Sequence, residues 1–297
     1  GPDLDLDQRT VPADDPEVWR MLRAADAIGC FQVESRAQLA LQPRLQPKVM
    51  ADLVVAVALI RPGPIQGGMA KAYLRRRDGE EPVSYWHPSL APVVEETLGI
   101  LVYQEQVLRV AMVVAGFTGA QADGLRRSMS RKRSREAMEA WRDDFLRGAA
   151  GRGIDAQAAG TIFDHLLGFA SYGFCKSHAA AFARLTWVTA WLKCHHPLPF
   201  YCALLNAQPM GFYTVETVLQ DARRHAIPPL PLHVNRSGAR WQVEGEALRV
   251  PLARLAGLGE DEAARMVAAR DAAGPFGDLW DFVRRVRPRR RDAERLV

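Results

Sequence analysis

The sequence has few cysteines, few lysines and no long apolar run. Its four cysteines, at positions 30, 175, 194 and 202, form no CxxC pair, which excludes the disulfide framework of a small secreted domain. Because no secretory signal is recognisable, we expect reduced thiols in a cytoplasmic protein. The longest apolar run, residues 49–60, is shorter than the roughly 20 residues that span a bilayer, so it predicts a buried helix and no membrane anchor.

Two stretches imitate metal sites, and we assign a metal to neither. The first gathers Cys194, His195, His196 and Cys202, a combination more typical of a helix end than of a ligand set. The second, DLDLD at 3–7, resembles the paired carboxylates of nucleotidyl transfer, but a solvated acidic terminus explains it better. The sequence therefore predicts no metal ligand in this chain.

Positive charge comes almost entirely from arginine. Only five of the 39 basic residues are lysines, and the net charge is +5 with an isoelectric point near 9.2. Such a balance permits a polyanionic partner without establishing one.

Hydrophobic periodicity predicts a mainly α fold. Helical patterns, with an aspartate cap before the first and Thr118 as a cap in the middle of the chain, cover residues 13–26, 46–60, 103–117, 118–129, 155–171 and 177–196. A loop rich in proline and glycine is expected at 61–69.

The composition changes after about residue 205. A helix over 209–225 is followed by an extended segment at 227–235, and the alternation at 240–252 predicts a β-hairpin. We predict a multi-helix domain over 1–205, a connector over 206–252 and the start of a helix–hairpin–helix module over 253–297.

The densest charge feature is RRSMSRKRSR at 126–135, with six basic residues in ten. A solvated helix face is one interpretation. The other is phosphate binding, which the lack of interleaved acids favours. The candidate DNA contacts are Arg126, Arg127, Arg131, Lys132 and Arg133.

A second candidate lies in FASYGFCKSHAAAF at 169–182. A helix that begins near Ser177 would point unpaired N–H groups outwards, with Lys176 and His178 beside them, and this arrangement binds phosphate. The alternative is that Ser177 only caps the helix and Lys176 is a solvated flank.

Three weaker candidates complete the set. Arg36 follows a short extended run, and Arg61 begins a rigid loop after a buried helix. In LAGLGEDEAARMV, at 255–267, Gly257 and Gly259 fit a helix–hairpin–helix whose backbone amides approach a DNA phosphate closely.

Five segments, in order along the chain, resemble a bacterial C-family DNA polymerase, the family of the DNA polymerase III alpha subunit: IGCFQVESRAQ (28–38), ALIRPGPIQGGM (58–69), GILVYQEQVLRVA (99–111), ADGLRRSMSRKR (122–133) and YGFCKSHAAAFA (172–183). LLNAQPMGFY (204–213), RPGPIQGG and Cys175 resemble the error-prone, translesion branch of that family. The resemblance implies a fingers domain followed by the start of a helix–hairpin–helix region.

Fingers in this family contact the incoming nucleotide and the template. The resemblance therefore implies nucleotide contacts at Arg36, Arg61, Tyr103, Gln104, Lys176, Ser177 and His178. The family's catalytic aspartates lie in a palm domain upstream of the fingers. The resemblance thus implies that Mg²⁺ acts in the parent polymerase on ligands outside this chain, and that the chain alone does not polymerise.

The implied partners are primer–template DNA and dNTP, with the sliding clamp and other proteins of a mutagenesis complex bound through the parent. The opening Gly1-Pro2 resembles the residue pair left by protease cleavage, so we expect a piece of a longer protein. Two alternatives stay open at this point: an autonomous, non-catalytic DNA-binding module, and a protein-interaction platform.

Overall fold

The computed structural model describes residues 11–60, 66–129, 134–169, 173–210 and 213–289. The fold is mainly α, with one small sheet, as the periodicity predicted. The chain divides into two compact units, and we describe each by itself. The first comprises residues 1–27 and 31–188, and the second comprises residues 28–30 and 189–297.

The first unit consists of helices only among its described residues. They are α1 (Pro16–Arg23), α2 (Arg36–Leu45), α3 (Met50–Leu59), α4 (Gln66–Arg77), α5 (Ala91–Val94), α6 (Gln104–Ala115), α7 (Gly119–Ser128), α8 (Ser134–Glu139), α9 (Arg142–Ala150), α10 (Ala156–Phe169) and most of α11 (Lys176–His195), with short 3₁₀ turns at Pro88–Leu90 and Glu95–Thr97.

Several helices begin and end at the capping residues that the sequence predicted. The Asp15 carboxylate accepts the N–H groups of Glu17 and Val18 at 2.9 and 3.2 Å, with Pro16 at the first helical position. Thr118 caps α7, and Gly116 ends α6 in the left-handed conformation with φ 66°. These local predictions are confirmed because capping depends only on neighbours in sequence.

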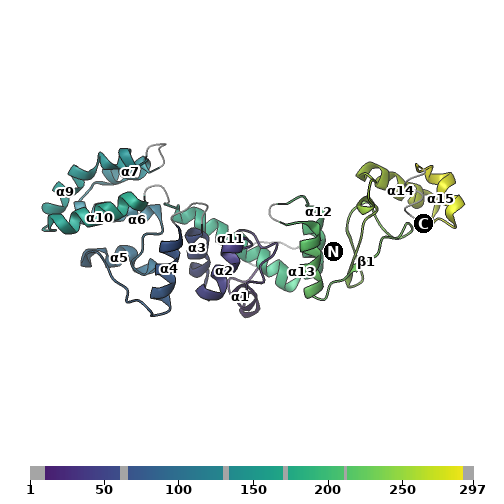
Figure 1. Ribbon diagram of the computed structural model, residues 1–297, viewed down its shortest axis with the longest axis horizontal. Coiled ribbons are helices and arrows are strands. Elements are labelled where there is room, and N and C mark those ends of the chain that lie inside the picture. The colour runs from purple at the N-terminus through teal and green to yellow at the C-terminus, as the bar shows by residue number, and fades with distance from the viewer. Residues whose placement is uncertain (1–10, 61–65, 130–133, 170–172, 211–212, 290–297) are drawn as a thin grey trace. The chain divides into compact units, whose positions relative to one another are not determined.

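A bundle of α6, α7, α9 and α10 forms the main core of the first unit (Figure 1). Its centre is Val107, Val110, Phe145 and Phe163, all fully buried. At the crossing of α6 and α9 a Cβ on Gly148 would lie 1.9 Å from the Ala115 carbonyl oxygen. Only glycine lets the two helix backbones approach this closely.

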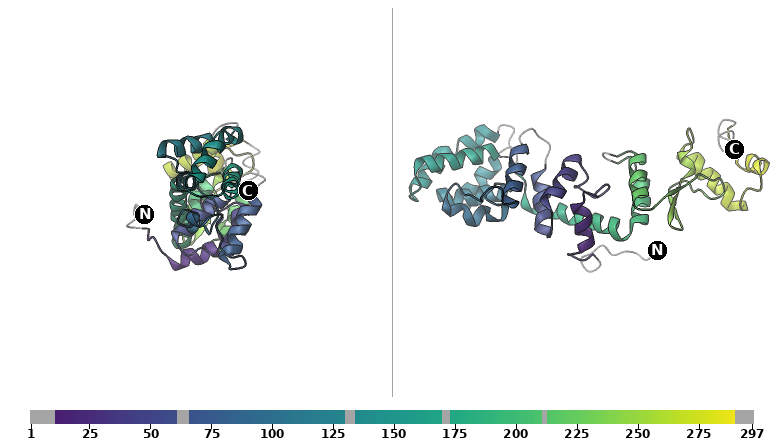
Figure 2. Two further views of the ribbon diagram at one scale, coloured as in Figure 1. Left: turned by 90° about the vertical axis from the view of Figure 1, so that its left-hand side faces the viewer. Right: turned by 60° about the horizontal axis from the view of Figure 1, so that its bottom comes forward.

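The second unit contains the end of α11, then α12 (Pro197–Asn206), α13 (Val215–Arg224), α14 (Glu260–Ala273) and α15 (Leu279–Val286). Its sheet has the order β1-β3-β2, built from β1 (Pro229–Leu230), β2 (Gln242–Glu244) and β3 (Ala247–Arg249). Strands β2 and β3 are antiparallel around Gly245, so the predicted hairpin is confirmed. Helices α14 and α15 lie side by side (Figure 2).

Some elements differ from the sequence-based prediction. Helix α4 begins at Gln66, inside the loop predicted at 61–69. Pro197 not only follows the end of α11 but also occupies the first position of α12, where its missing N–H costs nothing. Helix α3 begins at Met50 and not near residue 46, because the Asp52 carboxylate binds the N–H groups of Lys48 and Val49.

Apart from residues 28–30, the chain passes from the first unit to the second between Val188 and Thr189, within α11. The predicted domain boundaries after residues 205 and 252 stay predictions. Within the described ranges no helix is both long enough and apolar enough to cross a membrane.

Candidate nucleotide and DNA contact site

Helices α6 and α11 begin side by side, although about 70 residues separate them in the sequence. Tyr103 and Phe174 form an isolated parallel bridge just before the two helices. Gln104 donates its backbone N–H to the Phe174 carbonyl and its side-chain amide to the Gly173 carbonyl, both at 2.8 Å. The predicted candidates Tyr103 and Gln104 therefore lie at the start of the segment that carries Lys176.

The C-terminal end of α7 lies close to the starts of α6 and α11. A Cβ on Gly173 would lie 2.5 Å from Met129 Cε and 2.6 Å from Gln104 Cγ. Met129 directly follows α7, the helix that carries Arg126 and Arg127 in its last turn. Gly173 thus brings the basic end of α7 close to the starts of α6 and α11.

A carboxylate covers the first turn of α11. Both oxygens of Glu105 accept the backbone N–H of Lys176, at 3.0 and 2.9 Å, and one accepts from the Cys175 thiol at 3.2 Å. The helix begins at Lys176 and not at Ser177. Ser177 is therefore not the cap, and its hydroxyl lies 2.9 Å from Cys175 Sγ. Negative charge here complements the positive end of the helix dipole.

The Lys176 ammonium also meets a carboxylate. It pairs with Glu96 and lies 5.4 Å from the centre of the Tyr103 ring, while 45% of its side chain stays exposed. The Lys176 side chain thus has two defined neighbours although it is half-exposed, and both interpretations of Lys176 stay predictions. The ion pair of Lys176 with Glu96 is half-exposed, and such pairs contribute little to stability.

His178 is exposed on α11, within a row of rings. The centre of its imidazole ring lies 5.3 Å from the ring centre of Phe174 and 3.9 Å from that of Phe182. Phe182 in turn meets the edge of Phe31 at 5.1 Å. The rings of Phe174, His178 and Phe182 follow one another at a spacing of four residues, along one side of the start of α11.

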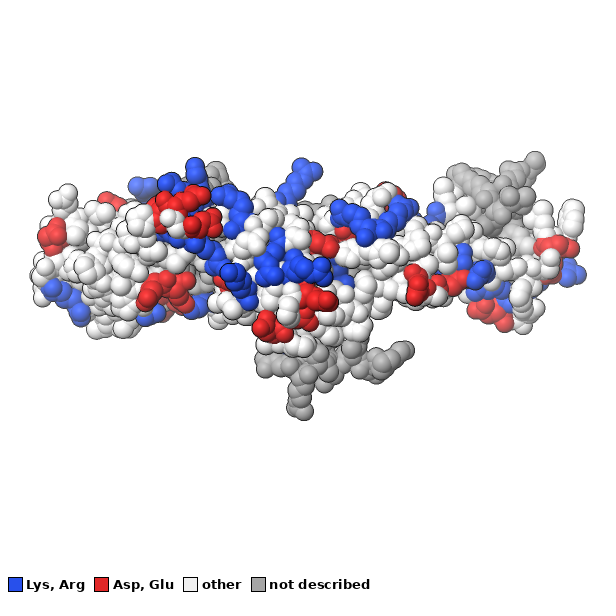
Figure 3. Space-filling view, turned by 90° about the horizontal axis from the view of Figure 1, so that it is seen from below, with Lys and Arg blue, Asp and Glu red and all other residues white. Residues whose placement is uncertain are grey.

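Arg126 and Arg127 share one carboxylate. Asp123 accepts from Arg126 at 2.8 Å and from Arg127 at 2.9 Å. The hydrogen bond from Arg126, together with the charge of Arg127, lowers the pKa of Asp123. An acid one turn earlier therefore partly neutralises the run, which the sequence analysis described as lacking interleaved acids. On the face drawn in Figure 3, basic and acidic side chains likewise lie next to one another.

Arg127 also lines a hollow of about 480 Å³ between α7, α8 and α9. Ser128 and Trp141 lie in the same wall, joined by a hydrogen bond of 3.2 Å from the indole N–H to the hydroxyl. Trp141 packs so closely on α7 that a Cβ on Gly124 would lie 2.8 Å from its ring.

The remaining predicted residues belong to other elements or lie outside the described residues. Arg36 is exposed at the first position of α2. Arg61, Arg131, Lys132 and Arg133 lie outside the described residues. Gly257 has a φ of 88°, and Gly259 precedes α14 with no side-chain cap and with open space where a Cβ would stand. That backbone is accessible, as the phosphate-contact prediction requires.

Glu96 and Glu105 are the residues that the sequence analysis missed. They lie 80 and 71 positions before Lys176, so no local spacing connects them to it. Glu105 immediately follows the candidate Gln104, and this adjacency was the one available signal.

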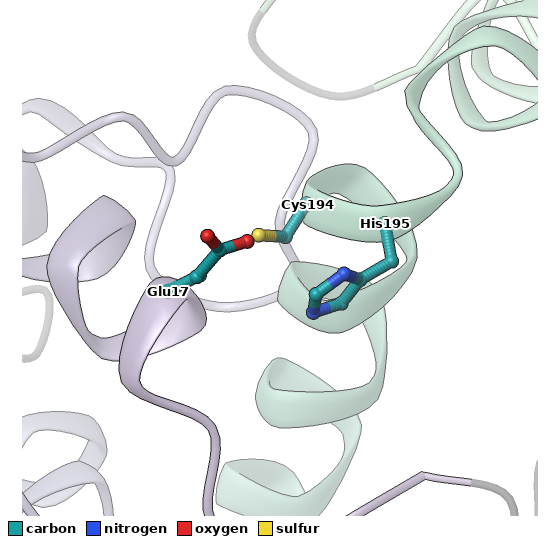
Figure 4. A group of neighbouring side chains, drawn as sticks. All are labelled: Glu17, Cys194 and His195. Carbon is teal, nitrogen blue, oxygen red and sulfur yellow. The ribbon is translucent and has the colours of Figure 1, made fainter.

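The described residues do not fit Mg²⁺. Mg²⁺ prefers oxygen ligands, whereas both groups of three possible ligands among these residues contain a histidine, and one contains a cysteine. Figure 4 shows one of them, with Cys194 and His195 at the end of α11. Each group draws residues from both compact units, and we assign no site to either.

Comparison with known proteins matches two regions of the chain. Residues 2–153 match the bacterial DNA polymerase III alpha subunit finger domain, and residues 226–297 match a helix-hairpin-helix motif. The second match confirms the module predicted from LAGLGEDEAARMV and begins earlier than residue 253.

Proteins named error-prone DNA polymerase are similar over nearly the whole chain. The one from Teredinibacter turnerae is 46% identical over 294 residues, 97% of this chain and 28% of the relative. Those from Anaeromyxobacter dehalogenans strain 2CP-C and Pseudomonas aeruginosa are 50% and 46% identical, over 94% and 97% of this chain and 26% and 28% of the relatives.

The chain thus spans little more than a quarter of the length of these relatives. The finger model alone covers more than half of the chain, from residue 2 to residue 153. The chain belongs to the bacterial DNA polymerase III alpha subunit finger domain family.

Proposed function

We propose that this chain is the fingers part of an error-prone DNA polymerase, and that the paired starts of α6 and α11 contact the triphosphate of the incoming dNTP. The observation that carries the proposal is the Lys176 ammonium, held over Tyr103 at the first turn of α11 by an exchangeable carboxylate, Glu96. A dNTP phosphate would take the place of Glu96 and gain the Lys176 ammonium, while Glu105 keeps the first turn of the helix.

The neighbouring groups support the same assignment. Gln104 holds the Gly173 carbonyl and so orients the segment before α11. The rings of Phe174, His178 and Phe182, which are tilted against one another, offer aromatic faces on which a base could stack. In this proposal Arg126 and Arg127, on the adjacent end of α7, contact the backbone of primer–template DNA.

The chain alone is proposed to be inactive in polymerisation. Phosphoryl transfer needs Mg²⁺ held by carboxylates, and the described residues offer no oxygen-only group of three ligands. Arg36, Arg61, Ser177, Arg131, Lys132 and Arg133 stay proposed contacts, and the sliding clamp and other proteins of a mutagenesis complex stay proposed partners of the parent.

Replacement of Lys176 in the full-length parent tests the nucleotide site. Lys176→Met should lower kcat/KM for dNTP by about 10- to 100-fold, because a charge-assisted contact to phosphate is worth about 1.5–3 kcal/mol. Glu96→Gln should act in the opposite direction and lower the KM for dNTP, since it frees the ammonium from its competing carboxylate. Steady-state incorporation of a single nucleotide on a primed template measures both effects.

Lys71→Met is the matched control. Lys71 is exposed on α4 of the same unit, and its loss should leave the kinetics unchanged. If Lys176→Met resembles this control, Lys176 serves only to anchor the start of α11, and the nucleotide assignment fails.

A non-catalytic DNA-binding module is the second candidate function. The accessible backbone at Gly257 and Gly259 and the arginines of α7 favour it. A change in DNA affinity on addition of dNTP would separate the fingers assignment from this candidate, because a simple DNA grip has no site for the nucleotide.

A further inference from the structure

Trp280 is the most exposed large apolar side chain among the described residues. It lies in the first turn of α15 and is 80% exposed. Tryptophan carries a large apolar surface and is enriched where proteins meet other molecules. The packing of the module does not explain it, because α15 buries Phe282 and Val286.

The exposed face of α15 is also basic. Trp280 and Arg284 are one turn apart, opposite the face of Phe282 and Val286. The Arg284 side chain is 81% exposed. Arg287 and Arg289, just beyond the helix, are exposed as well. The indole and the Arg284 guanidinium therefore share one face of α15, and two further exposed arginines follow the helix.

The acidic residues of α15 are committed to local structure. Asp278 caps the helix through the backbone N–H of Asp281 at 2.7 Å. Asp281 accepts from the Gly277 N–H and binds Arg284 and Arg285. Arg285 is itself structural, since it donates to the Ala269 and Gly274 carbonyls that end α14.

We propose that Trp280 and the surrounding arginines bind single-stranded DNA, with the indole stacked on an unpaired base and Arg284, Arg287 and Arg289 on the flanking phosphates. Aromatic stacking with basic residues beside it is the general way in which proteins bind single strands without reading their sequence. Charge complementarity favours a nucleic acid, and the free ring favours an unpaired strand, because duplex DNA keeps its base faces stacked inside.

The site is separate from the nucleotide site proposed on α6 and α11. It lies on the helix-hairpin-helix part of the second unit, and it does not use Gly257 or Gly259. Failure of one proposal therefore leaves the other standing.

Fluorescence anisotropy with labelled oligonucleotides tests the stacking directly. The full 297-residue chain is titrated with a single-stranded oligothymidylate and with an abasic oligonucleotide of equal length and charge. Trp280→Ala should weaken binding to the oligothymidylate by about 10-fold, the size of one base–aromatic stack, and leave abasic binding unchanged. Trp280→Phe should recover most of the loss.

Two controls define the result. Val243→Ala removes another exposed apolar side chain of the same unit and should change nothing. Binding of duplex DNA should be the same for Trp280→Ala and the unaltered chain, with circular dichroism confirming the fold of each variant.

Equal losses on the oligothymidylate and the abasic strand would overturn the proposal, because they would show that the ring does not touch a base. Acrylamide quenching in the full-length parent provides a second test. The Trp280 signal is obtained as the difference between the unaltered parent and Trp280→Phe. If acrylamide does not quench this signal in the absence of DNA, another part of the parent covers the ring, and this result also overturns the proposal.

Discussion

At the scale of single residues, the most deeply buried ion pair among the described residues lies in the second unit. Lys193 and Asp221 are fully buried and 2.8 Å apart, and Asp221 also accepts from the Tyr201 hydroxyl at 2.7 Å and pairs with the exposed Arg224. Burial alone would raise the pKa of Asp221, but Lys193, Tyr201 and Arg224 outweigh it and lower that pKa below its ordinary value of 3.8. The pair joins α11, α12 and α13.

Asp221→Asn should destabilise the second unit by about 3–5 kcal/mol, because it leaves the Lys193 ammonium buried without its counter-charge. Since the folded-state pKa of Asp221 is lowered, its contribution is fully present above pH 4 and disappears as the pH falls through the folded-state value. Urea unfolding of both proteins at a series of pH values measures this.

The double variant Asp221→Asn, Lys193→Met is the informative control, since it removes the stranded charge and should recover part of the loss. An Asp221→Asn variant as stable as the unaltered chain at neutral pH would contradict the role given to the pair.

At the scale of elements, the spacing of helices in the first unit depends on small residues at their crossings. Gly148 of α9 faces the Ala115 carbonyl of α6, and Gly173 faces Met129 and Gln104 where α6, α7 and α11 converge. The contact at Gly148 is with backbone, which cannot rotate away. The position of α9 on α6 therefore requires that residue.

Gly148→Ala should lower the free energy of unfolding by about 1–3 kcal/mol or more, because the added methyl group forces α6 and α9 apart. Gly160→Ala is the matched control: it is also a helical glycine, on α10, but with open space around the added Cβ. It should be neutral or stabilise by up to about 1 kcal/mol. Thermal unfolding compares the two, and equal melting temperatures would show that the α6–α9 crossing is looser than described.

At the scale of the whole molecule, the net charge of +5 is small, so DNA binding depends on where the charge lies. On the face drawn in Figure 3, acidic side chains lie beside groups of basic ones, and Arg126 and Arg127 share Asp123. The proposed contacts to the DNA backbone would therefore come from a few arginines that exchange a carboxylate partner for a phosphate.

Replacement of both Arg126 and Arg127 by alanine should weaken duplex DNA binding by the whole chain and flatten its salt dependence. Each lost phosphate contact reduces the slope of log K against log salt by about 0.9. Anisotropy over a salt series gives the slope. Arg223→Ala, which removes a half-exposed arginine paired with Glu216, should leave it unchanged. An unaltered slope for the double variant would remove Arg126 and Arg127 from the interface.

Local features of the fold were predictable because their physics is local. The caps at Asp15 and Thr118, the end of α6 at Gly116 and the hairpin at Gly245 depend on a few neighbouring residues. Two helix starts were not predicted. Helix α4 begins at Gln66, within a segment whose glycine and proline content favours a loop, and α12 begins at Pro197, which suits a first helical position.

The candidate site shows the division most clearly. The sequence by itself determined the mainly α class, through periodicity and capping. Its motifs identified the finger family and the candidate residues Tyr103, Gln104 and Lys176. Only the tertiary structure decided that Glu96 and Glu105 hold the start of α11. Contacts between residues 70 to 80 positions apart depend on how helices pack, and no local pattern in the chain encodes that packing.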